Sequence, residues 1–156
     1  MNTEPPGIGA AGNDVAQRIR MMKLIHLALV AGVLLFAGFV YVQVRDRMTC
    51  ELRFSNPVFL VAAALVATNM ALAMNLKNIM LRQAALGKAN VVTVQRYQVF
   101  FIARSAMLEG AALFCAAAVL ATKSIMPAIL LVLCVAVLIA KGPSVDEFQA
   151  MGGRAR

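Results

Sequence analysis

Four long apolar stretches constrain the fold of this chain more than any other feature. An α-helix rises 1.5 Å per residue, so about 20 residues cross the ~30 Å hydrocarbon core of a bilayer. The composition agrees, because 62% of the 156 residues are hydrophobic and only 14% are charged. We therefore predict an all-α fold, an integral membrane four-helix bundle. The predicted spans are residues 24–44, 56–76, 99–121 and 125–141.

The segments around the predicted four-span domain, residues 13–141, are short and polar. Residues 1–12 hold two prolines and three glycines, which predicts a disordered N-terminal tail. Residues 142–156 are polar and rich in glycine, and we expect a mobile C-terminal tail. The connection TKSIMP, residues 122–127, is short enough to make the third and fourth spans an antiparallel hairpin.

The basic residues indicate the orientation in the membrane. Of the 15 Lys and Arg residues, ten lie in the N-terminal segment, the long middle loop and the C-terminal tail. Four lie in the other two connections. Basic residues stay on the cytoplasmic side, so both termini are predicted to face the cytoplasm of a bacterial inner membrane. The basic residues behind the net charge of +8 then serve to orient the chain in the membrane, and we expect no nucleic-acid partner.

The third span carries a carboxylate close to its middle, Glu109. An ionised side chain at the centre of a bilayer costs about 2.5–3.5 kcal/mol on insertion scales, so it is usually paired, neutral or turned to a cavity. Counted from the cytoplasmic ends of their spans, Glu109 lies roughly 13 Å deep and Asn69 roughly 10 Å deep. We expect a largely neutral Glu109 that hydrogen-bonds Asn69 directly or through one water.

Three further polar residues fall in the same half of the spans: His26, Arg104 and Ser105. Arg104 is five residues before Glu109, some 140° away around the helix. We therefore expect Arg104 to reach lipid phosphates or to serve a different helix. His26 is expected at the headgroup level, because one histidine without neighbouring ligands is not a metal signature. The candidate proton- or ion-binding residues are Glu109, Asn69, Ser105, Arg104 and His26.

Three roles remain open for Glu109. It is either structural, hydrogen-bonded inside a packed bundle, or a titrating proton or cation site, or a contact to a neighbouring subunit. The residues that share its helical face, Ile102, Ser105, Ala112 and Ala116, are mostly small. They leave room for water, an ion or another helix.

Signatures of enzymes and of metal sites are missing from the sequence. It has no G-x-S-x-G, H-E-x-x-H, Walker or dinucleotide-binding motif, and its polar loops are short. The three cysteines form no C-x-x-C pair, which argues against a zinc site or a disulfide framework. We expect no enzymatic activity, no metal and no cofactor.

The segment R-S-A-M-L-E-G-A-A-L-F, residues 104–114, resembles a recurring feature of small bacterial four-span membrane proteins without assigned function. The segment K-L-I-H-L-A-L-V-A-G-V-L-L-F, residues 23–36, carries the same resemblance less strongly. An intramembrane Glu among small residues also resembles the proteolipid subunits of rotary ATPases, which implies proton binding at Glu109. Those proteolipids have glycine-rich inner helices, and this chain does not. Four-span drug exporters also use an intramembrane Glu, but in their first helix.

These observations predict a structural or assembly subunit of a membrane complex, with a polar layer around Glu109. The alternative is an ion- or proton-coupled transport subunit that uses Glu109 as its carrier site. The expected partners are the lipid bilayer and either further copies of the chain or a larger membrane complex. Carriers of this size need partner copies to enclose a pathway, so the oligomeric state separates the two functions.

Overall fold

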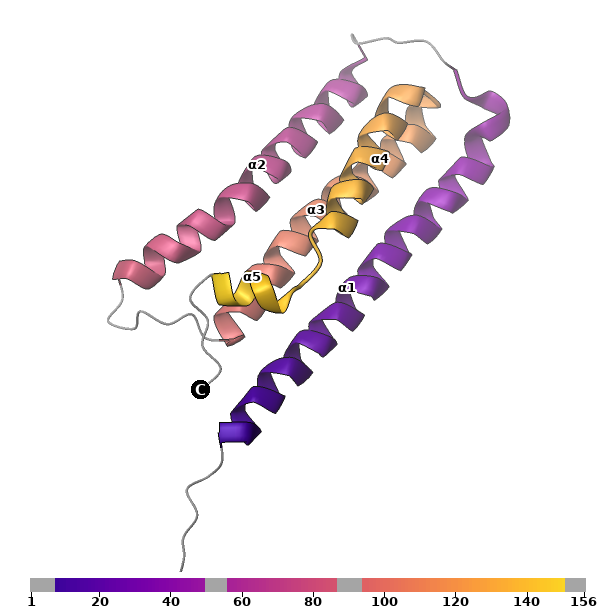
Figure 1. Ribbon diagram of the computed structural model, residues 1–156. Coiled ribbons are helices and arrows are strands. Elements are labelled where there is room, and N and C mark those ends of the chain that lie inside the picture. Colours follow the sequence, from indigo (N-terminus) through magenta and orange to yellow (C-terminus); the bar gives the residue numbers. More distant parts are fainter. Residues whose placement is uncertain (1–7, 50–55, 87–93, 151–156) are drawn as a thin grey trace, which may run out of the picture.

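The computed structural model describes residues 8–49, 56–86 and 94–150, and this part of the chain is helical throughout except for short connections (Figure 1). The prediction of an all-α chain is confirmed. The single β-type contact is an isolated bridge between Thr49 and Ser124 within the described ranges. The elements are α1 (Ile8–Val44), the 3₁₀ turn η1 (Arg45–Arg47), α2 (Pro57–Leu86), α3 (Val94–Thr122), α4 (Ile125–Ala140) and α5 (Val145–Ala150).

The helices reach beyond the predicted spans at three ends. α1 begins at Ile8, inside the expected tail, although Gly9 and Gly12 disfavour helix. α2 continues past residue 76 to Leu86 through a stretch of strong helix formers, and α3 begins at Val94 instead of residue 99. The remainder of the predicted N-terminal tail, residues 1–7, lies outside the described residues.

Among the described residues, three helices are long and apolar enough to cross a membrane, judged by length and composition: Val15–Arg47 within α1 and η1, Pro57–Leu76 within α2, and α3. α4 is more apolar than these helices but has 16 residues, a length of about 24 Å. Leucine, isoleucine and valine side chains are exposed all along these helices. A soluble protein rarely leaves so much apolar surface uncovered, which supports a membrane protein.

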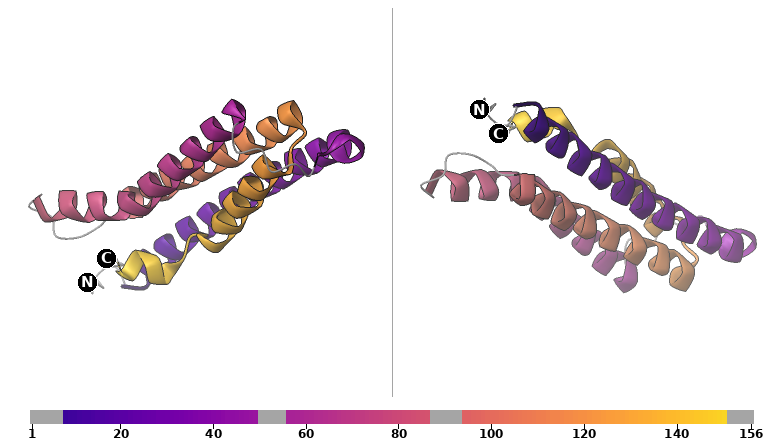
Figure 2. Two further views of the ribbon diagram at one scale, coloured as in Figure 1. Left: turned by 90° about the horizontal axis from the view of Figure 1, so that it is seen from above. Right: turned by 90° about the horizontal axis from the view of Figure 1, so that it is seen from below.

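α3 is the central helix. It packs against α1, α2 and α4. In Figure 1, α3 and α4 lie between α1 and α2, and consecutive long helices run in opposite directions. The views in Figure 2 place α2 alongside α3. In the most apolar stretch of each helix, 44% of the residues are buried in α3, against 17% in α2 and 11% in α1. α1 and α2 therefore present most of their surface outward.

The stripe of α1 that packs inward is narrow. Its buried residues recur from Ile19 to Val44 at intervals of three or four, with one interval of seven between Val33 and Val40, as in a coiled-coil seam. The main core joins this stripe to inner residues of α2, α3 and α4, including the free, buried thiols of Cys115 and Cys134. A second cluster lies at the end of the molecule that carries α5, and consists of Ile19, Met22, Tyr97, Phe100, Phe101 and Phe148.

The other end of the molecule is closed by a link between two connections. The Thr49 N–H donates to the Lys123 carbonyl at 2.8 Å, and the Ile125 N–H donates to the Thr49 carbonyl at 3.3 Å. Lys123 has φ 53°, in the left-handed region that usually ends a helix at glycine. Ser124 caps α4, since its side chain accepts the Met126 N–H. These bonds hold the α3–α4 hairpin that the sequence predicts.

Candidate functional site

Within the C-terminal segment, for which the sequence predicts a mobile tail, residues Val145–Ala150 form the helix α5. Ser144 caps α5, because its Oγ accepts the Glu147 N–H at 3.0 Å. Asp146 and Glu147 occupy the first turn, where negative charge favours the helix dipole. Phe148 is 2% exposed and meets the ring of Tyr97, with 5.5 Å between the ring centroids. Residues 151–156 lie outside the described part of the chain.

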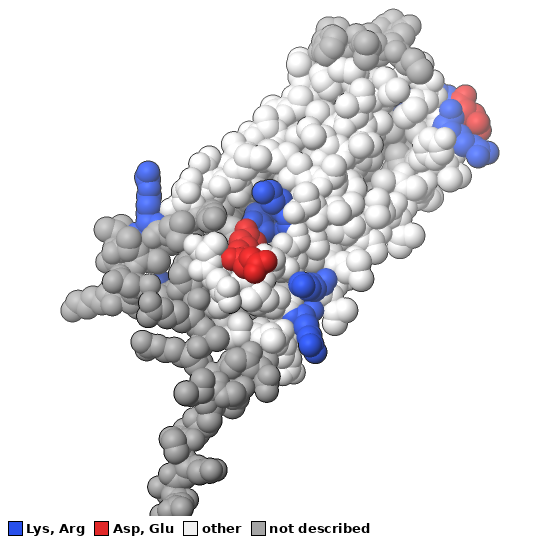
Figure 3. Space-filling model, in the orientation of Figure 1, with Lys and Arg blue, Asp and Glu red and all other residues white. Residues whose placement is uncertain are grey.

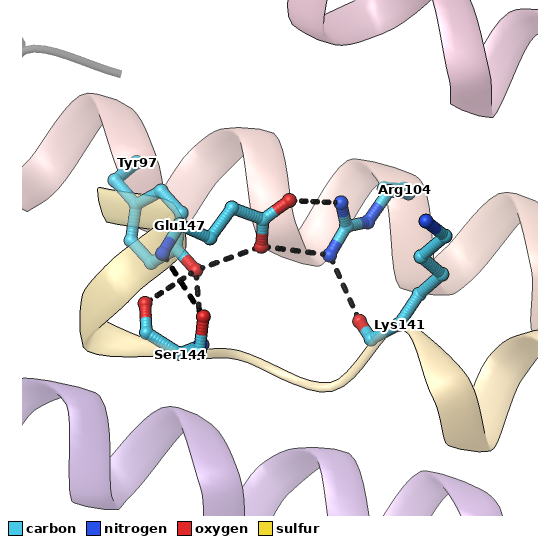
Figure 4. A network of polar contacts seen from close by, with 5 residues as sticks. All are labelled: Tyr97, Arg104, Lys141, Ser144 and Glu147. Carbon is cyan, nitrogen blue, oxygen red and sulfur yellow. Dashed lines mark hydrogen bonds and ion pairs between the residues drawn. The ribbon is translucent and has the colours of Figure 1, made fainter. Parts of the chain in front are cut away.

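A buried ion pair joins α5 to the central helix. Arg104 Nη1 donates to Glu147 Oε1 at 2.6 Å, and Nη2 donates to Oε2 at 3.2 Å (Figure 4). The Arg104 side chain is 8% exposed and that of Glu147 is 22% exposed. Two parallel charge-assisted bonds fix both side chains more firmly than one contact would. Of the two roles predicted for Arg104, the one it takes here is service to a different helix.

The same guanidinium also completes the end of α4. Arg104 Nη2 donates to the carbonyl of Lys141, the residue that ends this helix, at 2.8 Å. Carbonyls at a helix C-terminus have no partner within the helix and carry partial negative charge, so a cation is favourable there. Arg104 therefore holds α3, α4 and α5 together at one point.

Tyr97, two turns before Arg104 on α3, supports the ion pair. Its hydroxyl lies 3.1 Å from Glu147 Oε2 and 3.3 Å from the Ser144 carbonyl, and it accepts the Ser144 N–H at 3.3 Å. Figure 4 shows Tyr97 and Arg104 reaching Glu147 from the same helix. The carboxylate of Glu147 thus has hydrogen-bond donors on both sides, which compensates its removal from water.

Aromatic rings line the inner side of this network. The Arg104 guanidinium carbon lies 5.0 Å from the ring centroid of Phe100 and 5.8 Å from that of Phe101, within cation–π range. Phe101 also meets His26 of α1 edge to face, with 5.5 Å between the centroids. The rings bring Arg104 and His26 to one aromatic cluster, although the two residues lie on different helices.

His26 of α1 is buried against the other helices. It is 9% exposed, and its Nδ1 has no hydrogen-bond partner among the described residues. Gly142 lies against it, since a Cβ there would stand 3.5 Å from the imidazole. Ser105, also predicted for the polar layer, is 2% exposed. Arg104, Ser105 and His26 therefore all enter the protein interior.

Glu109 is separate from this network. It lies on the border between the buried and exposed sides of α3, beside the exposed Ile102 and Ala106. Within the described residues it makes no hydrogen bond or ion pair, and neither does the side chain of Asn69. The direct hydrogen bond expected between Glu109 and Asn69 is not formed. The predicted polar layer is thus divided into a hydrogen-bonded network at Arg104, in which only the buried Nε of Arg104 has no partner among the described residues, and an unpaired carboxyl at Glu109.

The sequence interpretation missed Tyr97, Ser144 and Glu147, and a signal for two of them was present. Ser144-Val145-Asp146-Glu147 is an S-x-x-E capping-box pattern directly before an apolar residue, which marks a helix start. The geometry of the α3–α4 hairpin also indicates where this short helix lies. Arg104 and Gly142 are equally far in sequence from Lys123, the residue at the turn, so they lie at the same end of the hairpin. A carboxylate just after Gly142 is therefore well placed to meet Arg104.

The described residues include no group of three or more His, Cys, Asp or Glu side chains placed to hold a metal ion. The Arg104 network is an ion pair in which both Nη atoms are hydrogen-bonded, while the buried Nε has no partner among the described residues, and its chemistry is that of a structural clamp. No protein family model, curated protein or solved structure matches this chain. Its function is therefore inferred from its own residues.

Proposed function

We propose that this chain is a four-span protein of a bacterial inner membrane, with both termini in the cytoplasm, that serves as a structural or assembly subunit of a membrane complex. Glu109 is the residue through which it contacts a neighbouring chain, either another copy or a different subunit. The observation that carries the proposal is the unpaired carboxyl of Glu109 among the described residues. It lies in the most apolar part of the chain's central helix.

The cost of an unpaired polar group supports a partner from outside the chain. In hydrocarbon no water is available, and an unsatisfied carboxyl remains unfavourable even when protonated. Helices in membranes relieve this cost by hydrogen bonds to neighbouring helices, at close approach over small residues. Ala106 and Gly110 beside Glu109 are exposed, so a neighbouring helix can approach it closely.

The surfaces of α1 and α2 fit the same proposal. Large apolar side chains such as Leu35, Val42 and Val61 are more than half exposed. A chain with this small an interior obtains further packing from lipid or from neighbouring subunits. The three-helix clamp at Arg104 then keeps the shape of the subunit fixed while its outer helices make contacts.

The test is the size of the complex extracted from membranes in mild detergent. Glu109→Leu removes the proposed contact, whereas Glu109→Gln keeps a hydrogen-bonding group of the same shape. We expect Glu109→Leu to shift the complex to single chains without lowering the thermal stability of the chain itself. Glu109→Gln is expected to leave the complex intact.

Asn75→Leu is the matched control, because it removes another exposed polar group from a membrane helix. The Asn75 amide donates to the Ala71 carbonyl of its own helix at 2.9 Å, so it needs no outside partner. The complex is expected to survive this substitution. Wild-type protein that runs as a single chain in mild detergent would contradict the proposal.

A transport function is the second candidate, and the same carboxyl favours it. A carrier site must bind and release a proton or cation, and Glu109 has no fixed cation among the described residues that would hold it ionised. In that function Glu109→Gln abolishes proton-coupled flux in vesicles while the protein stays folded. In the assembly function the complex keeps both its size and its activity with Glu109→Gln.

A further inference from the structure

A cleft of about 250 Å³ lies between α2, α3, α4 and α5, at the end of the molecule that carries α5. One part of its lining is charged and consists of Arg104, Lys141 and Glu147. The other part is apolar and consists of Met70, Ala73, Met74, Leu108 and Val137. The cleft is thus amphipathic.

The charged part lies toward the membrane surface and the apolar part toward the membrane centre. Leu108 is one turn deeper than Arg104 along α3, and Val137 is one turn deeper than Lys141 along α4. One turn is roughly 5–6 Å of depth. A molecule in this cleft therefore meets charge at one end and hydrocarbon at the other, in the same order as the bilayer around it.

The charge of the cleft favours an anion. Glu147 neutralises Arg104 through the bidentate pair, which leaves Lys141 as the uncompensated charge of the lining. The Lys141 ammonium makes no ion pair among the described residues, and its side chain is exposed. Figure 4 shows this side chain without a partner among the residues drawn, and Figure 3 shows a basic group beside acidic groups on this face, with further basic groups close to them.

The apolar wall suits a flexible chain. Met70 and Met74 are unbranched and adaptable, and Met74 is 62% exposed. The volume is below the usual range of about 300–1,000 Å³ for sites that enclose a whole drug-sized ligand. It fits one end of a longer molecule, the remainder of which lies in the surrounding lipid.

We propose that this cleft binds an anionic phospholipid, with its phosphate at Lys141 and the upper part of an acyl chain against Met70, Leu108 and Val137. Basic residues near a membrane surface attract anionic headgroups. This binding does not depend on Glu109, which lies on another side of α3, some 140° from Arg104.

The experiment measures lipid that stays bound to the purified full-length protein. Protein in detergent is mixed with equal amounts of phosphatidylglycerol and phosphatidylcholine of the same acyl chains, and retained lipid is counted by native mass spectrometry. We expect at least a threefold preference for phosphatidylglycerol. Equal retention of the two lipids by wild-type protein would overturn the proposal.

Two variants with matched controls locate the site. Lys141→Gln is expected to abolish the preference, whereas Lys23→Gln, which removes an exposed charge of α1 outside the cleft, is expected to keep it. Ala73→Leu fills the apolar part and is expected to reduce retention of both lipids at least twofold. Its control is Ala67→Leu, at an exposed position of α2 outside the lining. If a variant and its control changed the retained lipid equally, lipid would be binding to the surface in general, which would overturn the proposed site.

Glycerol phosphate at millimolar concentration distinguishes a lipid from a free anion. It carries the phosphate without the acyl chain, so we expect it to leave the retained phosphatidylglycerol unchanged. Displacement of the lipid by glycerol phosphate would show an anion site that makes no use of the apolar wall, against the proposal. Thermal unfolding of each variant confirms that it is folded before lipid is counted.

Discussion

Arg104 and Glu147 are 43 residues apart in the chain and form a bidentate ion pair that fastens the short helix α5 to the central helix α3. The pair is mostly buried, and its guanidinium also binds the last carbonyl of α4. The buried guanidinium of α3 thus finds its counterion in a segment that follows the last long helix. The pair ties the end of the chain to its centre.

Glu147→Gln is expected to destabilise the protein strongly. It leaves Arg104 buried without a counterion, and breaking a buried pair in this way costs on the order of 3–5 kcal/mol. The control is Asp146→Asn at the exposed neighbouring position, for which we expect a change within about 0.5 kcal/mol. Thermal unfolding in detergent measures both, and equal melting temperatures for the two variants would show that the ion pair does not hold α5.

The double variant Arg104→Gln/Glu147→Gln tests the pairing itself. With both charges removed, no uncompensated charge remains, so the double variant is expected to lose less stability than the sum of the two single variants. Additive losses, measured in the same melts, would mean that each residue acts alone.

Phe148→Ala is expected to release α5 while the long helices stay folded. Phe148 is the buried apolar anchor of a helix of six residues, which is too short to be stable without packing. Hydrogen exchange of residues 145–150 measures the release, and we expect these amides to exchange at the rate of an unprotected chain. Gln149→Ala, at an exposed position of the same helix, is the control and is expected to retain protection.

Lys123→Gly is expected to raise the melting temperature. Lys123 has φ 53°, a conformation that costs an L-residue about 1–2 kcal/mol and costs glycine nothing. The gain is reduced by the greater freedom of glycine in the unfolded chain, to a net value of about 0.5–1 kcal/mol. Ala121→Gly, in the last turn of α3, is the control and should lower stability by a similar amount. A lower melting temperature for Lys123→Gly would show that its side chain, and not its backbone, is what matters at this turn.

Reporter fusions test the proposed orientation. A reporter after Arg156 and another within residues 84–90 are expected to read cytoplasmic, and one near Cys50 is expected to read external, because of the distribution of basic residues. Arg156 and Cys50 lie outside the described residues. Thr49 and Lys123 share one end of the molecule, so a reporter at Lys123 should agree with the one near Cys50. A C-terminus that reads external would reverse the orientation.

The apolar spacing of the sequence is enough to predict the long helices, because burial in lipid requires uninterrupted runs of about 20 apolar residues. The partner of Arg104 was within reach of the same reasoning. The S-x-x-E pattern at Ser144 marks a helix, and hairpin geometry places that helix next to Arg104. The prediction of a mobile tail was based on the average composition of residues 142–156, which is polar and rich in glycine. The six residues of α5 have little weight in that average.

The surroundings of Glu109 were harder to predict. Depth along the helix axis places Glu109 and Asn69 at one level, but it says nothing about which side of α3 faces α2. That direction depends on how α1, α2 and α4 share the circumference of α3, and therefore on packing between helices far apart in the sequence. The burial of His26 has the same origin, because α1 meets Phe101 and Gly142 only in the folded chain.

The most direct measurement is photo-crosslinking in intact membranes from a position beside Glu109. A photoreactive amino acid replaces Ile102, which is 43% exposed and lies two turns from Glu109 on the same edge of α3. Val132 of α4, which is 68% exposed, is the control position on a different surface. We predict one discrete protein adduct from position 102, lost on Glu109→Leu and kept on Glu109→Gln, and no protein adduct from position 132. The absence of a protein adduct at position 102, or an adduct unchanged by Glu109→Leu, would contradict a subunit contact at Glu109.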